Sequence, residues 1–163
     1  MPDQSIKLRL DAFLPFRLAV LSNAVSTQIK KIYEDEFRLS MWEWRVIAIL
    51  GEDDGLTSTA ISERAFMDKP MVSRTVTSLQ NRGLLLRTRD PKDRRREPLI
   101  LTSQGREIYD VVAPRALSIE QSLVSAFSNA EFELFESFLQ RLADIASAER
   151  PLWKTNPPGH DDH

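Results

Sequence analysis

The chain has 163 residues, enough for one domain with a real core, and its 42% hydrophobic and 28% charged residues are an ordinary balance for a globular protein. It contains no Cys, and both His residues, His160 and His163, lie near the C-terminus, which excludes disulfide scaffolds, thiolate catalysis and Cys-ligated metal sites. No apolar run approaches the roughly 18–20 residues that span a bilayer, and the N-terminus lacks the pattern of a signal peptide, so we expect a cytoplasmic protein.

A long amphipathic helix is predicted for about residues 11–37. Pro15 is tolerated only in a first turn, so this helix should begin near Phe13 or Leu14, unless Pro15 kinks a longer helix. The apolar stripe is longer than one small core requires, and we expect part of it to face another chain. Its residues recur at intervals of three or four: Leu14, Leu18, Leu21, Val25, Ile29 and Ile32.

Two shorter helices are predicted next. The stretch WEWRVIAILGE has helical apolar spacing, and Gly51 near its end suits a helix stop. After the turn EDDG, Thr57 is a good N-cap for a short helix that ends near residue 65.

The next helix, within MDKPMVSRTVTSLQNRG, has two contrasting faces. Asp68 can cap it, Pro70 suits its first turn and Gly83 suits its end, while an apolar stripe turns inward. The other face carries hydroxyls, an amide and a guanidinium, the groups that read base edges and phosphates. These residues are Ser73, Arg74, Thr77, Ser78 and Asn81.

After Gly83 the pattern changes and predicts a basic β-hairpin. LLLRTR and EPLILT read as two strands joined by the turn DPKDRR. Residues 69–97 contain nine basic residues against three acids, a local net charge of +6 in a chain whose net charge is −2. This segregation is typical of a surface that faces a polyanion, although composition alone also allows a solvated charged loop.

Two helices are predicted to complete the fold. Thr102 or Ser103 should cap a helix over about residues 104–127, interrupted or bent near Pro114, and Asn129 should cap the last helix. Apolar residues repeat at helical spacing in this last helix: Phe132, Phe135, Phe138 or Leu139, Leu142 and Ile145. They are typical of a core or an interface.

Two short helices followed at once by a basic hairpin indicate a winged helix-turn-helix. Residues 39–109 resemble the MarR family of bacterial transcriptional regulators, through EWRVIAIL, MDKPMVSRTVTSLQNRGLLLRTRD and DRRREPLILTSQG. The last piece is similar to the family's D-x-R turn followed by L-T-x-x-G. Its residues here are Asp93, Arg95, Leu101, Thr102 and Gly105.

The resemblance implies a mainly α fold with a small β-hairpin wing: a winged helix-turn-helix with N- and C-terminal dimerisation helices. We expect residues 1–38 to hold the N-terminal dimerisation helix and residues 39–103 the DNA-binding domain. Residues 104–149 should form the C-terminal dimerisation helices, and residues 150–163 a flexible tail.

The resemblance also implies roles for the wing residues. Arg95 would enter the minor groove of DNA, and Asp93 would orient it through a charge-assisted hydrogen bond. Arg94 and Arg96 would neutralise phosphates.

Four residues of the preceding helix would complete the DNA contacts. Ser73, Arg74 and Thr77 would face the major groove, and Lys69 would contact the DNA backbone where the helix begins. For each arginine, a solvated surface position is the alternative.

Members of this family commonly sense a small effector, often aromatic or carboxylate-bearing. Arg17, Asn23, Trp42 and Arg45 could line such a site, although for each an ordinary packing role is the simpler interpretation. The implied protein is a ligand-responsive, sequence-specific regulator. As a homodimer it would bind a pseudo-palindromic operator in double-stranded DNA, and it is usually a repressor.

Two other classes of function are alternatives to a DNA-binding regulator. An enzyme has little support, because there is no His or Cys outside the C-terminal end, no glycine-rich phosphate loop and no paired carboxylates with a base. We therefore expect no catalytic site, no cofactor and no metal. A winged helix that serves only protein–protein contact is the alternative function, but it has no need of so many basic groups.

Overall fold

A computed structural model of the chain describes residues 7–88, 97–147 and 152. In chain order the elements are the 3-10 helix η1 (Leu10–Ala12), the helices α1 (Leu14–Phe37), α2 (Met41–Glu52), α3 (Ser58–Ala65) and α4 (Lys69–Asn81), the strands β1 (Leu85–Arg87) and β2 (Leu99–Leu101), and the helices α5 (Ser103–Val124) and α6 (Asn129–Ala146). The prediction of a mainly α chain with one hairpin is confirmed.

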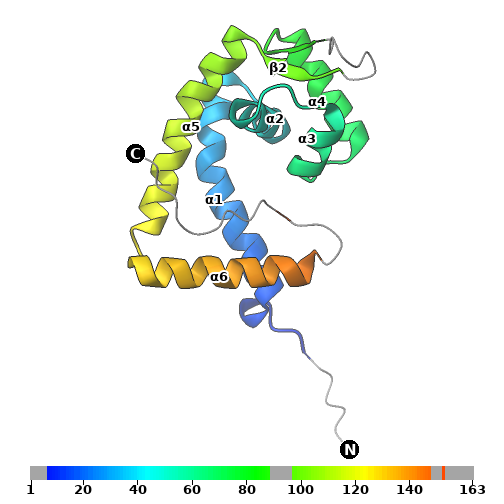
Figure 1. Ribbon diagram of the computed structural model, residues 1–163. Coiled ribbons are helices and arrows are strands. Elements are labelled where there is room, and N and C mark those ends of the chain that lie inside the picture. Colours follow the sequence, from blue (N-terminus) through cyan, green and yellow to red (C-terminus); the bar gives the residue numbers. More distant parts are fainter. Residues whose placement is uncertain (1–6, 89–96, 148–151, 153–163) are drawn as a thin grey trace, which may run out of the picture.

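The elements form a lobe, a stem and a crosspiece (Figure 1). Helices α2, α3 and α4 gather with the hairpin into the lobe. Helices α1 and α5 pack against each other as the stem. Helix α6 lies across the far end of the stem, away from the hairpin (Figure 1).

Most helix ends follow local chemistry, as predicted. Helix α1 begins at Leu14 with Pro15 in its first turn, and Thr57 caps α3 by accepting a hydrogen bond from the backbone N–H of Ala60. Asp68 caps α4 in the same way, and Gly83, with φ of 68°, follows the end of that helix. These ends depend on residues within one turn, so the sequence suffices to find them.

Two predicted boundaries are wrong. Ser128 rather than Asn129 caps α6, because Ser128 and Glu131 form a reciprocal capping box. An interruption at Pro114 is also wrong, because α5 continues through this residue, whereas a bend at Pro114 stays a prediction. The side chain of Val112 is fully buried there, and packing of α5 along α1 compensates for the backbone hydrogen bond that Pro114 cannot donate.

Gly51 does not end α2, as the sequence suggested, but lies inside it. A Cβ atom at this position would stand 2.1 Å from Cδ2 of Tyr109, a residue of α5. Gly51 is therefore present because the Tyr109 ring packs directly on the backbone of α2.

Gly51→Ala is expected to lower the stability of the fold by roughly 1–3 kcal/mol, the usual cost of forcing an extra carbon into a packed core. Thermal unfolding followed by circular dichroism measures the effect. Tyr109→Leu removes the ring that clashes, so Gly51→Ala should cost much less in that background. An equal loss in both backgrounds would contradict the explanation.

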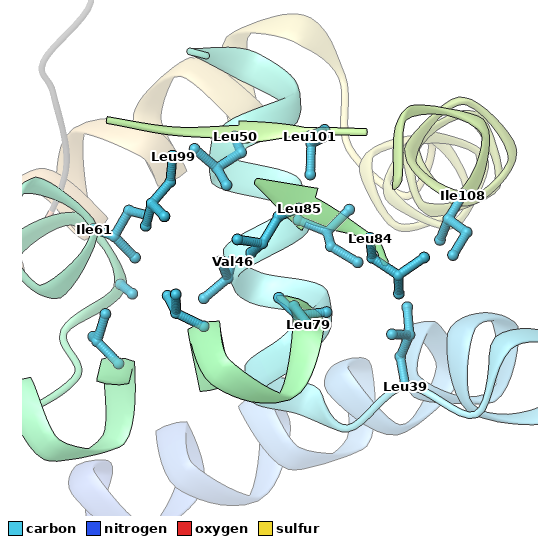
Figure 2. Close-up of a cluster of buried hydrophobic side chains, with 14 of the residues drawn as sticks. Leu39, Val46, Leu50, Ile61, Leu79, Leu84, Leu85, Leu99, Leu101 and Ile108 are labelled. Atoms are coloured by element: carbon cyan, nitrogen blue, oxygen red, sulfur yellow. The ribbon is translucent and has the colours of Figure 1, made fainter. Parts of the chain in front are cut away.

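The core of the lobe draws apolar side chains from every element around it. Leu50 from α2, Ile61 from α3 and Leu79 from α4 meet Leu85 and Leu99 of the two strands, all of them fully buried (Figure 2). The strands pair in antiparallel register, with Leu85 opposite Leu101 and Arg87 opposite Leu99.

The hairpin has a further partner that the sequence did not reveal. Leu56, just before α3, forms an isolated antiparallel bridge with Leu99, whose N–H donates to the Leu56 carbonyl oxygen at 2.9 Å. The base of the wing is thereby attached to the start of α3.

Candidate nucleic-acid interface

Helix α4 presents the predicted polar face to solvent. Lys69, Ser73, Arg74 and Thr77 are all exposed, and we call these four residues the outer face of α4. The side chains behind them are buried in the lobe: Val72, Thr75, Val76 and Leu79. This division follows the 3.6-residue period of the helix.

The outer face keeps its charges available. Within the described residues, neither Lys69 nor Arg74 forms an ion pair, and Nη2 of Arg74 lies 4.0 Å from the Met71 Sδ atom. The Thr77 hydroxyl donates to the Ser73 carbonyl oxygen at 2.9 Å, which leaves its lone pairs and methyl group facing outward. Such a face can neutralise phosphates and contact base edges.

Ser78 was predicted on the outer face, and this prediction is wrong. Its hydroxyl is half-buried and donates to Oε1 of Glu43 on α2 at 2.8 Å. The same oxygen accepts from Nη1 of Arg82 at 3.2 Å. Glu43 also caps α2, where its other carboxylate oxygen accepts from the Ser40 N–H at 2.8 Å. The S-x-x-E spacing of a capping box was the available sequence signal for Glu43.

Glu43 is a buried carboxylate that its neighbours keep charged. Burial by itself raises the pKa of Glu43, but hydrogen bonds from the Ser40 backbone, from the Ser78 and Ser40 hydroxyls and from Arg82 together outweigh it. The pKa of Glu43 therefore lies below its ordinary value of 4.5.

This shift predicts a dependence of stability on pH. The pKa of Glu43 is lower in the folded protein than in the unfolded chain, where it is near 4.5. The charged carboxylate therefore stabilises the fold fully above pH 4.5, and this stabilisation is lost as the pH falls through the pKa of the folded protein. Glu43→Gln keeps the size of the side chain but cannot titrate. The thermal unfolding midpoints of the wild type and of Glu43→Gln should therefore differ at neutral pH and converge in acid. A constant difference at every pH would contradict this role of the carboxylate.

The base of the wing is built from the two strands and one ion pair. Nη1 of Arg87 on β1 lies 3.1 Å from Oε2 of Glu97, just before β2, so this ion pair joins the two strands of the wing at their base. The tip lies outside the described residues. The roles predicted for Asp93, Arg94, Arg95 and Arg96 therefore remain predictions.

The L-T-x-x-G segment joins the wing to the end of α4. The Thr102 hydroxyl donates to the Gly83 carbonyl oxygen at 2.7 Å and accepts from the Gly105 N–H at 3.1 Å, which caps α5. A Cβ atom at position 105 would stand 2.1 Å from the Leu84 carbonyl oxygen. Only glycine allows α5 to begin so close to the hairpin.

The four candidate effector residues fall into two separate places. On α2, the Arg45 guanidinium lies 5.3 Å from the centroid of the half-buried Trp42 ring, and its Nη1 donates to the Ala65 carbonyl oxygen at 3.1 Å. The pair thus joins α2 to the end of α3. Arg17 and Asn23 are exposed on the N-terminal half of α1. Among the described residues, no hydrogen bond, ion pair or ring contact joins Arg17 or Asn23 to Trp42 or Arg45.

The far end of the molecule exposes many large apolar side chains. They lie on the N-terminal half of α1, on the C-terminal half of α5, in the turn that follows α5 and on α6, and we call them the terminal apolar surface. Its members are Leu14, Phe16, Leu18, Val20, Leu21, Leu117, Leu123, Phe127, Leu134, Phe135, Phe138, Leu142 and Ile145. Exposed apolar residues in such number are typical of an interface.

Among the described residues, none of the helices has the length and apolar character required to cross a membrane.

A family model described as the MarR family matches residues 39–96, which include α2, α3, α4 and β1. The HTH-type transcriptional regulator FarR of Neisseria gonorrhoeae is 26% identical over 148 residues, which cover 91% of this chain and 98% of FarR.

Two solved structures extend the similarity to the three-dimensional fold. A MarR/EmrR family transcriptional regulator from Acinetobacter sp. ADP1 is 26% identical, with a TM-score of 0.77 over 86% of this chain and 99% of that one. S. aureus MepR, solved as a complex with DNA, has a TM-score of 0.72 and 23% identity over 83% of this chain and 98% of its own. The sequence motifs, the lobe with its wing and these similarities lead to one conclusion: residues 39–96 match the MarR family, and the chain is similar in sequence and fold to transcriptional regulators of that family.

Proposed function

We propose that this regulator binds a pseudo-palindromic operator in double-stranded DNA as a homodimer and that a small effector releases it. The observation that carries the proposal is the outer face of α4, which exposes Lys69, Ser73, Arg74 and Thr77 on a helix held firmly by its buried side. The fold shared with MepR, a protein solved bound to DNA, supports the same conclusion.

The proposed contacts follow from groove dimensions. The major groove is wide enough for one α-helix, so α4 would bring Arg74 and its neighbours to the base edges. The wing would then reach the adjacent minor groove, where a narrow groove concentrates negative potential around an inserted Arg95. Asp93 would orient Arg95, and Arg94 and Arg96 would neutralise phosphates.

A homodimer is supported by the terminal apolar surface. A second copy of the chain would cover it by a two-fold interface, in which the same residues meet their counterparts. Two recognition helices would then lie about one DNA turn apart, roughly 34 Å, which requires two half-sites of inverted sequence. An interface formed by α1, α5 and α6 leaves the lobe and its wing free.

Release by an effector would be a shift between two arrangements of the lobes. An aromatic or carboxylate-bearing ligand that binds one arrangement better draws the dimer toward it and away from the operator. The coupling is reciprocal, so DNA must weaken effector binding by the same factor. Arg17, Asn23, Trp42 and Arg45 are the residues we propose to test as effector contacts. Because one chain keeps them apart, a shared site would require the partner copy.

A titration of the protein against a labelled duplex from its own upstream region tests the proposal. We expect binding tighter than micromolar that weakens as salt rises, with a slope of about −0.9 for each phosphate contact. The DNA of an unrelated gene serves as the control. Absent or salt-insensitive binding would reject operator recognition and would instead favour a winged helix that contacts only other proteins.

A further inference from the structure

Arg82 belongs to the basic segment of the chain, yet its side chain is engaged inside the protein. Its Nη2 donates to the Phe37 carbonyl oxygen at 2.7 Å, and its Nη1 lies 3.2 Å from both the Arg38 carbonyl oxygen and Oε1 of Glu43. The guanidinium is therefore directed away from the phosphates that residues 69–97 as a whole were expected to face.

The two carbonyl oxygens bound by Arg82 belong to the end of α1. Arg38 ends that helix in the left-handed conformation, with φ of 53°, so the last carbonyls of α1 lack intrahelical partners. The guanidinium satisfies two of them and places a positive charge at the negative end of the helix dipole. One side chain at the end of α4 thus holds the end of α1.

Glu43, a residue of α2, also binds the Arg82 guanidinium. It accepts from Ser78 and Arg82, which stand one helical turn apart along the end of α4. Arginine suits this position because its planar fork offers several N–H donors in fixed directions, whereas lysine offers one compact ammonium group. We name Glu43, Ser78 and Arg82 the α1–α4 latch.

We infer that the α1–α4 latch positions the recognition helix relative to α1. The inference rests on the proposed function, in which α1 belongs to the dimer interface and α4 enters the major groove. A fixed angle between these helices sets the separation of the two recognition helices before DNA arrives. The latch thus raises operator affinity by preorganisation, without touching DNA.

Arg82→Ala tests this role in the full-length protein. Operator affinity should fall by about 2- to 30-fold, the range seen when residues of a coupling network are changed. The slope of log affinity against log salt should stay unchanged, because no phosphate contact is lost. Arg82→Lys should recover only part of the affinity, although it restores the charge. Ser78→Ala, a milder change that keeps Arg82, should weaken binding less.

Arg106→Ala is the matched control. Arg106 also donates to a carbonyl oxygen, that of Gly51, and pairs with Asp54, each at 2.8 Å. The exposed fractions of the two side chains are nearly equal, 32% for Arg82 and 35% for Arg106, but neither Gly51 nor Asp54 belongs to α4. The Arg106→Ala variant should lower the Tm by about as much as Arg82→Ala does, and it should leave operator affinity unchanged. An equal loss of operator affinity in both variants would mean that the latch residues act only through the overall stability of the fold, and this would overturn the inference.

Arg74→Ala separates failure of the latch from failure of the proposed function. If Arg74→Ala weakens binding and Arg82→Ala does not, the latch is overturned and operator recognition stands. If neither variant changes binding, recognition through α4 itself is wrong. A salt slope reduced by about 0.9 in Arg82→Ala would mean that Arg82 contacts a phosphate, which also overturns the inference.

Discussion

Leu142→Asp is expected to convert the proposed homodimer into monomers, and Phe135→Asp should do the same. Both side chains belong to the terminal apolar surface on α6 and are more than a third exposed in a single chain. An interface would bury them, and a buried carboxylate without a partner costs several kcal/mol at each of the two symmetric positions. Light scattering with size-exclusion chromatography measures the mass directly.

Ser137→Asp provides the control for the interface. Ser137 lies on the same helix as Phe135 but points to nearly the opposite side, since two residues correspond to about 200° of rotation. This variant should remain dimeric, with the same helical content as the other two. A dimer that tolerates both Phe135→Asp and Leu142→Asp would show that α6 is not the interface.

Loss of the dimer should also weaken operator binding severely. A monomer contacts one half-site, so it loses both the contacts and the effective concentration that the second recognition helix provides. Binding to a duplex with a single half-site should be nearly the same for the wild type and the monomeric variant. This comparison separates an effect on assembly from damage to the DNA-binding lobe.

Arg95→Ala is expected to lower operator affinity by roughly 1–3 kcal/mol while the dimer stays intact. An arginine in a narrow minor groove responds to the enhanced negative potential of A·T-rich sequence. The loss should therefore be largest for operators with A·T-rich flanks and small for G·C-rich ones. Fluorescence anisotropy with both duplexes gives the comparison.

Two variants define what Arg95 does beyond supplying charge. Arg94→Ala should weaken binding to both duplexes about equally and reduce the salt slope, as expected for a phosphate contact. Arg115→Ala removes the same charge from the stem, where Arg115 pairs with Glu36 on α1, and should leave binding unchanged. Unchanged affinity in Arg95→Ala would remove the wing tip from the mechanism.

Much of the lobe could be predicted from the chain because its signals are local. The cap at Asp68, the left-handed glycine at position 83 and the apolar stripe of α4 each depend on residues within one or two helical turns. The outer face of α4 followed directly, since burial of one stripe leaves the opposite stripe exposed. For these elements, sequence pattern and tertiary packing agree.

Two of the wrong predictions, at Gly51 and Ser78, share one physical cause. Gly51 was assigned to a helix end because glycine is common there, but its role depends on Tyr109, 58 positions later in the chain. Ser78 was assigned to the DNA face from its polarity, whereas Glu43 draws it inward. Polarity and propensity cannot reveal a partner that only folding brings near.

The order of elements, the helix caps, the basic hairpin and the polar face of α4 were determined by the sequence alone, because hydrogen bonds and periodicity within a few residues specify them. The tertiary structure decided which basic groups remain free for a polyanion and which are used inside the protein. Arg74 stays exposed, while Arg82 binds the end of α1, 45 residues away. Charge is a property of each residue, but the direction in which a charged group points depends on how distant helices pack.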